Sequence, residues 1–127
     1  MKKYKLTKEK KEFLGKTLFR IRALKNFSNV KKGELGGWIE KESNLSQEEN
    51  CWVSGDAWVF GDAWVYGDAM VSGDARVFGN AWVFGNAWVY GDCKIKDIRL
   101  CSRFCFKKQE DVKKWIKLEK EFEQEKN

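Results

Sequence analysis

Hydrophobic and polar positions repeat with a period of six residues through the middle of the chain. Reading from Trp52, the successive units are WVSGDA, WVFGDA, WVYGDA, MVSGDA, RVFGNA, WVFGNA and WVYGDC, followed by a fading KIKDIR. Val holds the second position of every full unit, and Ala or Cys holds the sixth. Self-similarity at a short fixed period is typical of repeat architectures.

Each unit predicts one short strand and one corner. Side chains of a strand point alternately to opposite faces, so Ala57 and Val59 face one side while Trp58 and Phe60 face the other. Small and β-branched residues suit a narrow core. Gly followed by Asp or Asn comes next in every unit, and these residue types accept the left-handed backbone region most readily. A strand and a corner every six residues describe a solenoid.

This pattern resembles the repeat of the hexapeptide-repeat proteins, in which an aliphatic residue is followed by three variable residues, a small residue and one more. The resemblance covers residues 51–96. It implies a left-handed parallel β-helix with three hexapeptides per coil, and hence a little over two coils. A right-handed β-helix and a β-roll are alternatives, although the calcium-binding roll needs a nonapeptide repeat that is absent here. We therefore predict an all-β solenoid, a short left-handed parallel β-helix.

A second resemblance extends beyond the repeat. The segment from Arg20 to Val53, together with the repeats, is similar to a group of small hexapeptide-repeat proteins of prophages and phages. The similarity spans about residues 4–96. Most members of the group are uncharacterised and are described as transferases or polymer-forming proteins. The resemblance implies a phage or mobile-element origin and offers no catalytic residue to carry over.

Three units to a coil place residues 18 positions apart on the same wall, about 4.8 Å from each other. Each of the three walls then shows two outward columns. The columns are Trp52, Met70 and Trp88 beside Ser54, Ser72 and Tyr90; Trp58, Arg76 and Lys94 beside Phe60, Phe78 and Lys96; and Trp64 and Trp82 beside Tyr66 and Phe84. The third wall is wholly aromatic.

These outward rings have two interpretations. Rings on neighbouring strands stabilise a sheet through cross-strand contacts, so they can simply cover the prism. A contiguous exposed aromatic surface, however, tends to mark an interface, and Arg76 above Trp58 adds a cation–π contact. We predict a partner-binding surface that consists of Trp58, Trp64, Tyr66, Arg76, Phe78, Trp82, Phe84 and Trp88.

Residues 1–50 are predicted to form an N-terminal β cap, because an open coil would expose its core and an unpaired strand edge. Residues 17–24 alternate as a strand. This strand pairs around Gly15 with one of two earlier stretches, 4–6 or 12–14. An irregular first coil then begins near Ile39 and Leu45.

The solenoid over 51–96 is followed by a C-terminal capping segment, 97–127. Within it, Asp111 can cap an amphipathic α-helix that runs over about 111–125. The 127 residues fit a single domain, since one hydrophobic core usually serves about 100–150 residues.

The composition excludes several kinds of active site. The chain has no His, which removes His general bases, Ser-His and Cys-His nucleophiles, and His-ligated zinc. Cys51 and Cys93 hold the small-residue position and should pack in the core, while Cys101 and Cys105 form a pair with no further ligand nearby. We predict no catalytic residue, cofactor or metal site, and thus a protein that is not an enzyme.

The formal net charge of +6 is unevenly distributed. Residues 1–50 and 94–127 are basic, whereas 51–93 hold only Arg76 against five Asp, so an acidic partner should be held by the ends. No apolar run reaches the roughly 20 residues that span a bilayer, and the N-terminus lacks an export signal. We expect a protein of the bacterial cytoplasm with reduced thiols.

Together these observations favour a non-enzymatic binding protein that presents an aromatic solenoid wall and basic caps to a protein or nucleoprotein partner. A rigid surface lowers the ordering cost of association. If the phage resemblance holds, the partner is a host defence complex, and the protein is an anti-CRISPR-like inhibitor. The alternatives are an acyltransferase-like hexapeptide-repeat enzyme and a nucleic-acid or nucleotide binder. Self-association as a homodimer or homotrimer is compatible with each.

Overall fold

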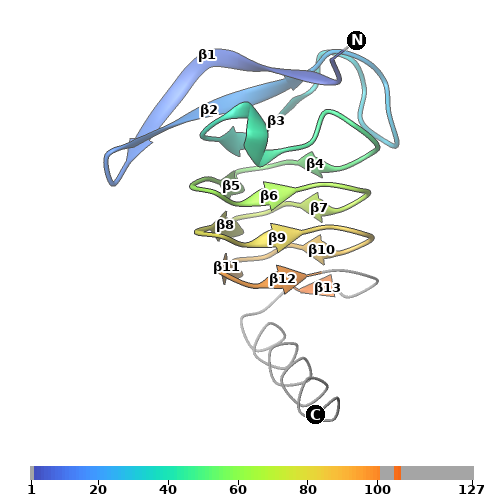
Figure 1. Ribbon diagram of the computed structural model, residues 1–127. Coiled ribbons are helices and arrows are strands. Elements are labelled where there is room, and N and C mark those ends of the chain that lie inside the picture. The colour runs from blue at the N-terminus through green and yellow to red at the C-terminus, as the bar shows by residue number, and fades with distance from the viewer. Residues whose placement is uncertain (1, 101–104, 107–127) are drawn as a thin grey trace.

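The computed structural model describes residues 2–100 and 105–106, and it shows a narrow parallel β-solenoid beneath a β-hairpin (Figure 1). This confirms the predicted all-β solenoid class. The elements in chain order are β1 (Tyr4–Phe13), β2 (Lys16–Ala23), β3 (Leu35–Ile39), the 3-10 helix η1 (Glu42–Asn44), β4 (Trp52–Val53), β5 (Trp58–Val59), β6 (Trp64–Val65), β7 (Met70–Val71), β8 (Arg76–Phe78), β9 (Trp82–Val83), β10 (Trp88–Val89), β11 (Lys94–Lys96), β12 (Arg99–Leu100) and β13 (Cys105–Phe106).

The strands stack into three walls. We call them the hairpin wall, with strand order β1-β2-β3-β5-β8-β11; the groove wall, β13-β10-β7-β4; and the ladder wall, β12-β9-β6. Residues 18 positions apart lie in register on each wall, and this confirms the predicted columns. Examples are Trp52 with Met70, Trp58 with Arg76, and Trp64 with Trp82.

The solenoid completes about four turns, whereas the repeat count predicted a little over two. One coil precedes the repeat, where an irregular first coil was expected near Ile39 and Leu45; it is built by β3, by an isolated bridge between Leu45 and Val65, and by β4. Another is built by β11, β12 and β13. Apart from β4, which begins the first full unit, these segments lack the full hexad motif. They pair with the neighbouring coil nonetheless, because ladder hydrogen bonds are made by backbone groups.

The core consists of stacked small and β-branched side chains, as predicted. Val53 and the other Val residues of the repeats are fully buried, as are the Ala and Cys residues at the sixth position of each unit. Where the motif is absent, larger aliphatic side chains occupy the Val position and are buried as well. They are Ile39, Leu45, Ile95 and Leu100.

The hairpin covers the N-terminal end of the solenoid. Strands β1 and β2 pair antiparallel around Gly15, and β2 then pairs with β3 of the first coil. The left-handed sense of the coils and the division of the chain at residues 50 and 96 stay predictions. The helix predicted over 111–125 lies outside the described residues.

Two buried polar side chains fix the start of the hairpin to the first coil. The Tyr4 hydroxyl donates to the carbonyl oxygens of Glu42 and Leu45. Lys3 is fully buried, and its Nζ donates to the carbonyl oxygen of Cys51 at 2.7 Å. Burial lowers the pKa of Lys3 and raises the pKa of Tyr4. Buried polar groups of this kind must be hydrogen-bonded, and here their partners are carbonyls of the segment that enters the solenoid.

Glycines with positive φ form the corners, as predicted. Gly73 has a φ of +66°, and a Cβ atom on it would lie 3.0 Å from both the backbone nitrogen and the backbone oxygen of Gly91 in the next coil. Beside it, the backbone N–H of Asp74 donates to the carbonyl oxygen of Gly91 at 2.7 Å. In the last coil Asp97 holds the glycine position with a φ of 58°, a conformation that Asp tolerates better than most residues.

We expect Gly73→Ala to lower the free energy of unfolding more than Gly15→Ala. Both glycines have a positive φ, but an added Cβ meets nothing within 4 Å at Gly15. Left-handed backbone costs a non-glycine residue about 1–2 kcal/mol, and the contact with Gly91 adds to this cost at Gly73. Urea unfolding followed by circular dichroism measures both values. Equal destabilisation by the two substitutions would mean that the corners do not restrict side-chain size.

Candidate functional site

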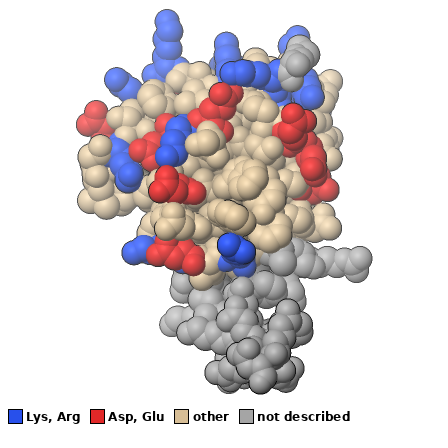
Figure 2. Space-filling view, viewed as in Figure 1, with Lys and Arg blue, Asp and Glu red and all other residues tan. Residues whose placement is uncertain are grey.

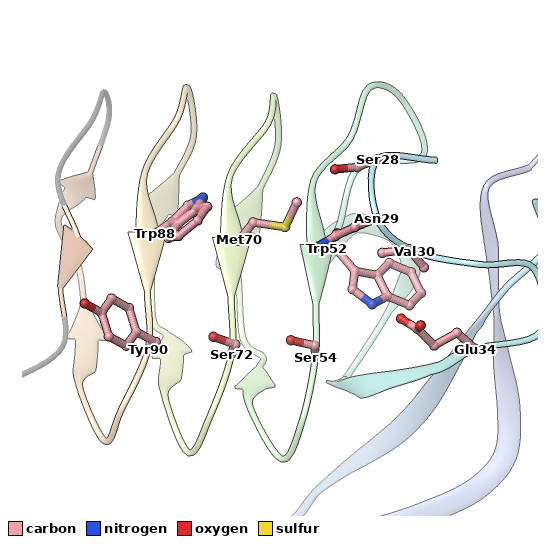
Figure 3. Close-up of a pocket in the computed structure, with 10 residues that line it drawn as sticks. All are labelled: Ser28, Asn29, Val30, Glu34, Trp52, Ser54, Met70, Ser72, Trp88 and Tyr90. Carbon is pink, nitrogen blue, oxygen red and sulfur yellow. The ribbon is translucent and has the colours of Figure 1, made fainter. Parts of the chain in front are cut away.

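An elongated groove runs over successive coils of the groove wall (Figure 3). Its floor combines an apolar column with a column of hydroxyl groups, and Trp88 is 52% exposed there. The floor residues are Trp52, Met70 and Trp88, and Ser54, Ser72 and Tyr90. The cavity volume of about 750 Å³ lies within the range of roughly 300–1,000 Å³ that is usual for small-molecule sites.

A loop from the N-terminal cap closes one end of this groove. The backbones of Phe27 and Val30 exchange hydrogen bonds of 3.0 and 2.8 Å, and the Phe27 ring packs edge-on against Trp52 at 5.3 Å between centroids. Between them Ser28 has a φ of 48°, which non-glycine residues adopt rarely. The loop thereby places four residues against the groove: Ser28, Asn29, Val30 and Glu34.

Glu34 is the one charged residue among the ten that line the groove. Figure 3 shows its carboxylate at the closed end, near the Trp52 indole. The Nε1 hydrogen of Trp52 is buried and lacks a hydrogen-bond partner within the described part of the chain. An unpaired buried donor costs about 1–3 kcal/mol, so an acceptor that reaches this atom would remove that cost. Because apolar side chains, hydroxyl groups and the Glu34 carboxylate line it together, the groove is amphipathic and carries negative charge at its closed end.

The ladder wall presents a continuous row of rings. Trp64 stacks on Tyr66 at 3.9 Å, Tyr66 stacks on Phe84 at 4.9 Å, and Trp64 meets Trp82 edge-on at 5.9 Å. The Arg99 guanidinium lies 4.4 Å from the Trp82 ring. Trp64 is 38% exposed. Figure 2 shows the molecule in the orientation of Figure 1. Few charged side chains lie over the middle of the solenoid in that view, and most Lys and Arg side chains lie toward the hairpin end.

The rings of the hairpin wall are more enclosed than those of the ladder wall. The Arg76 guanidinium lies 3.8 Å from the centroid of the Trp58 ring, and Phe13 of β1 packs edge-on against the same indole at 4.8 Å. Phe60 is buried and stacks on Phe78 at 5.2 Å. The hairpin thus covers the upper part of this wall and leaves Arg76 and Phe78 half-buried.

The eight residues predicted to bind a partner are divided among three walls. They are Trp58, Arg76 and Phe78 on the hairpin wall, Trp64, Tyr66, Trp82 and Phe84 on the ladder wall, and Trp88 on the groove wall. Four of them form one contiguous surface, and their role stays a prediction. The six-residue repeat predicted the floor columns of the groove but gave no indication of Glu34, because the closing loop lies outside the repeat and carries no motif.

The thiols and carboxylates of the described residues form no metal centre: no group of three or more potential ligands is placed to hold an ion. Cys51 and Cys93 are free and buried in the core, and burial raises the pKa of the Cys51 thiol. Cys101 lies outside the described residues. A helix long and apolar enough to cross a membrane is also absent from the part of the chain that the structure describes.

Two comparisons relate the repeats to known proteins. A family model described as YdcK beta solenoid repeat matches residues 63–77 and 75–91. The chain is also similar to the Escherichia coli (strain K12) protein named uncharacterized acetyltransferase YdcK, with 38% identity over 61 residues. This match covers 42% of the chain and 19% of the relative. The chain therefore spans only a small part of the relative's length.

These findings correct one prediction. The chain was predicted not to be an enzyme, but the relative it resembles is named an acetyltransferase. The prediction gave too much weight to the absence of His, although carboxylates also serve as general bases. The comparisons do not show the phage origin that the second resemblance implied. They support a hexapeptide-repeat β-solenoid with repeats similar to those of YdcK.

Proposed function

We propose that the protein is an acyltransferase-like β-solenoid and that the groove is its substrate site. The observation that carries this proposal is a groove of small-molecule size whose one charged side chain, Glu34, stands at the closed end. The similarity to a protein named an acetyltransferase supports it. Sites for small molecules combine apolar surface with a few placed polar groups, and this groove has both.

The floor suits an elongated substrate. Neighbouring strands lie about 4.8 Å apart, so apolar and hydroxyl groups recur side by side along the solenoid axis on β4, β7 and β10. A flexible acyl-bearing arm with alternating methylene and amide groups can pack on the apolar column formed by Trp52, Met70 and Trp88. Its amides can hydrogen-bond to the hydroxyls of Ser54, Ser72 and Tyr90.

Glu34 is the residue we assign to proton transfer. In acyl transfer from a thioester, the lone pair of the acceptor attacks the carbonyl carbon, the C–S bond breaks, and the acceptor loses a proton. The Glu34 carboxylate takes this proton and then delivers it to the leaving thiolate. A carboxylate placed in this way contributes about 10²–10⁴-fold as a general base. No other charged side chain lines the described groove.

Acetyl transfer can be measured directly. We expect acceptor-dependent release of free thiol when the protein is incubated with acetyl coenzyme A and a panel of amines and alcohols. Glu34→Gln should lower the rate by about 100-fold, because the amide cannot accept the proton. Glu12→Gln is the matched control, since Glu12 is exposed on the hairpin and should leave the rate unchanged. No release above background with any acceptor, or equal rates in both variants, would contradict the proposal.

Partner binding at the ladder wall is a second candidate function. The observation that favours it is the ring row of this wall, in which Trp64 is 38% exposed and the other three rings are half-buried. Large exposed aromatic surfaces tend to mark interfaces, and Trp and Tyr are frequent hot-spot residues. The partner is a macromolecule or another copy of this chain. No described feature selects a defence complex as that partner.

Two single substitutions on different walls test this second function. Affinity capture from a bacterial lysate, with quantitative mass spectrometry, should no longer recover the specific partner with Trp64→Ser and should retain it with Trp88→Ser. Trp88 is the matched control because it is an exposed indole on the groove wall. Circular dichroism verifies that both variants fold. Identical recovery with the two variants, or mass measurement showing no complex, would rule out the ladder wall as the interface.

A further inference from the structure

Most of the cations between residues 51 and 100 lie on one wall of the solenoid. Residues 51–100 contain four Lys or Arg residues. Three of them belong to strands β8 and β11 of the hairpin wall, and the fourth, Arg99, belongs to the ladder wall. The groove lining has none. The hairpin wall is therefore the side of the solenoid suited to an anionic ligand.

These three cations and one ring form a compact cluster, which we call the cationic patch: Arg76, Phe78, Lys94 and Lys96. Parallel pairing places Lys94 beside Arg76 and Lys96 beside Phe78. Paired residues on adjacent strands lie about 4.8 Å apart. All four side chains belong to alternate positions of their strands and so project from the same face.

Two planar groups lie within this patch. The Arg76 guanidinium is held over the Trp58 indole at 3.8 Å, and its Nη1 donates to the carbonyl oxygen of Asp74 at 3.0 Å. Phe78 stacks on Phe60 with an interplanar angle of 5°. Both planes are therefore fixed by neighbouring side chains. Nucleic-acid bases stack on aromatic rings and on guanidinium planes in this way.

The arrangement of charge also favours an anion. Like charges opposite each other on neighbouring strands destabilise a sheet, and Arg76 and Lys94 are such a pair. Asp97 follows Lys96 in sequence, and its Oδ1 accepts the backbone N–H of Asn80 at 2.8 Å. A phosphate bound between Arg76 and Lys94 would be attracted by both charges.

We propose that the cationic patch binds single-stranded nucleic acid. A base stacks on Phe78 or on the Arg76 guanidinium, and the lysines contact the flanking phosphates. An acidic protein segment would also be attracted by the charges. The planar groups of Arg76 and Phe78 favour a nucleic acid over an acidic protein segment, because bases can stack on them and Asp or Glu side chains cannot. This patch lies on a different wall from the groove and does not depend on the proposed acyl transfer.

The test is fluorescence anisotropy with labelled single-stranded oligonucleotides of about 12 nucleotides, oligo(dT) and oligo(U), at several salt concentrations. We expect the double variant Arg76→Gln/Lys96→Gln to bind at least tenfold more weakly. A plot of the logarithm of the binding constant against the logarithm of the salt concentration has a negative slope. For the variant, the magnitude of this slope should fall by about 0.7 for each phosphate that it no longer neutralises. The matched control Lys8→Gln/Lys10→Gln removes the same charge from exposed hairpin lysines and should bind like the original chain.

A third variant separates stacking from charge. Arg76→Lys keeps the charge but removes the planar guanidinium, so we expect severalfold weaker binding with an unchanged salt slope. Thermal unfolding of each variant verifies that it folds. Absence of binding by the original chain would overturn the proposal, as would equal weakening in the two double variants. Competition by polyglutamate as strong as that by the oligonucleotide would also overturn it and would favour an acidic protein partner.

Discussion

The close stacking of glycine corners is the constraint on which the rest of the structure depends. At four successive corners, those of Asp56, Asp62, Asp68 and Asp74, the backbone N–H donates to a glycine carbonyl of the next coil, as from Asp56 to Gly73 at 3.1 Å and from Asp62 to Gly79 at 2.9 Å. A Cβ on Gly55, Gly61, Gly67 or Gly73 would lie 3.0–3.3 Å from a backbone nitrogen of the next coil. The coils therefore cannot slip along one another, and within the hexad units each outward side chain lies beside a partner 18 positions away. Rows of rings, hydroxyls and cations are consequences of this register.

Much of the fold follows from the sequence because this register is local. The six-residue period fixes which side chains face the core, and Val53 or Ala57 can be assigned before any coordinates are known. The count of hexads does not give the number of coils, although an irregular first coil was expected near Ile39 and Leu45. Leu45 and Leu100 enter the core without a hexad around them, because an added coil needs only backbone pairing and one apolar side chain of adequate size. A search for the motif undercounts such coils.

The candidate groove was harder to predict for a different reason. Its floor is periodic, but its closed end depends on the bridge between Phe27 and Val30 and on the contact of Phe27 with Trp52. These are tertiary contacts of a loop without a repeat or a motif. Glu34 was therefore one carboxylate among many in the sequence, and the absence of His suggested no catalysis. A carboxylate placed at the end of a groove has a chemical context that composition cannot show.

The three walls share one backbone but present different chemistry. The groove wall is amphipathic with Glu34 at one end, the ladder wall is aromatic, and the hairpin wall carries Arg76, Lys94 and Lys96. The solenoid core is built from small side chains at every level, so an outward residue can change without repacking the interior. Substitutions at well-separated sites usually act independently. Such a fold can carry an acyl-transfer groove and a nucleic-acid patch together, because neither site draws on side chains that the other needs.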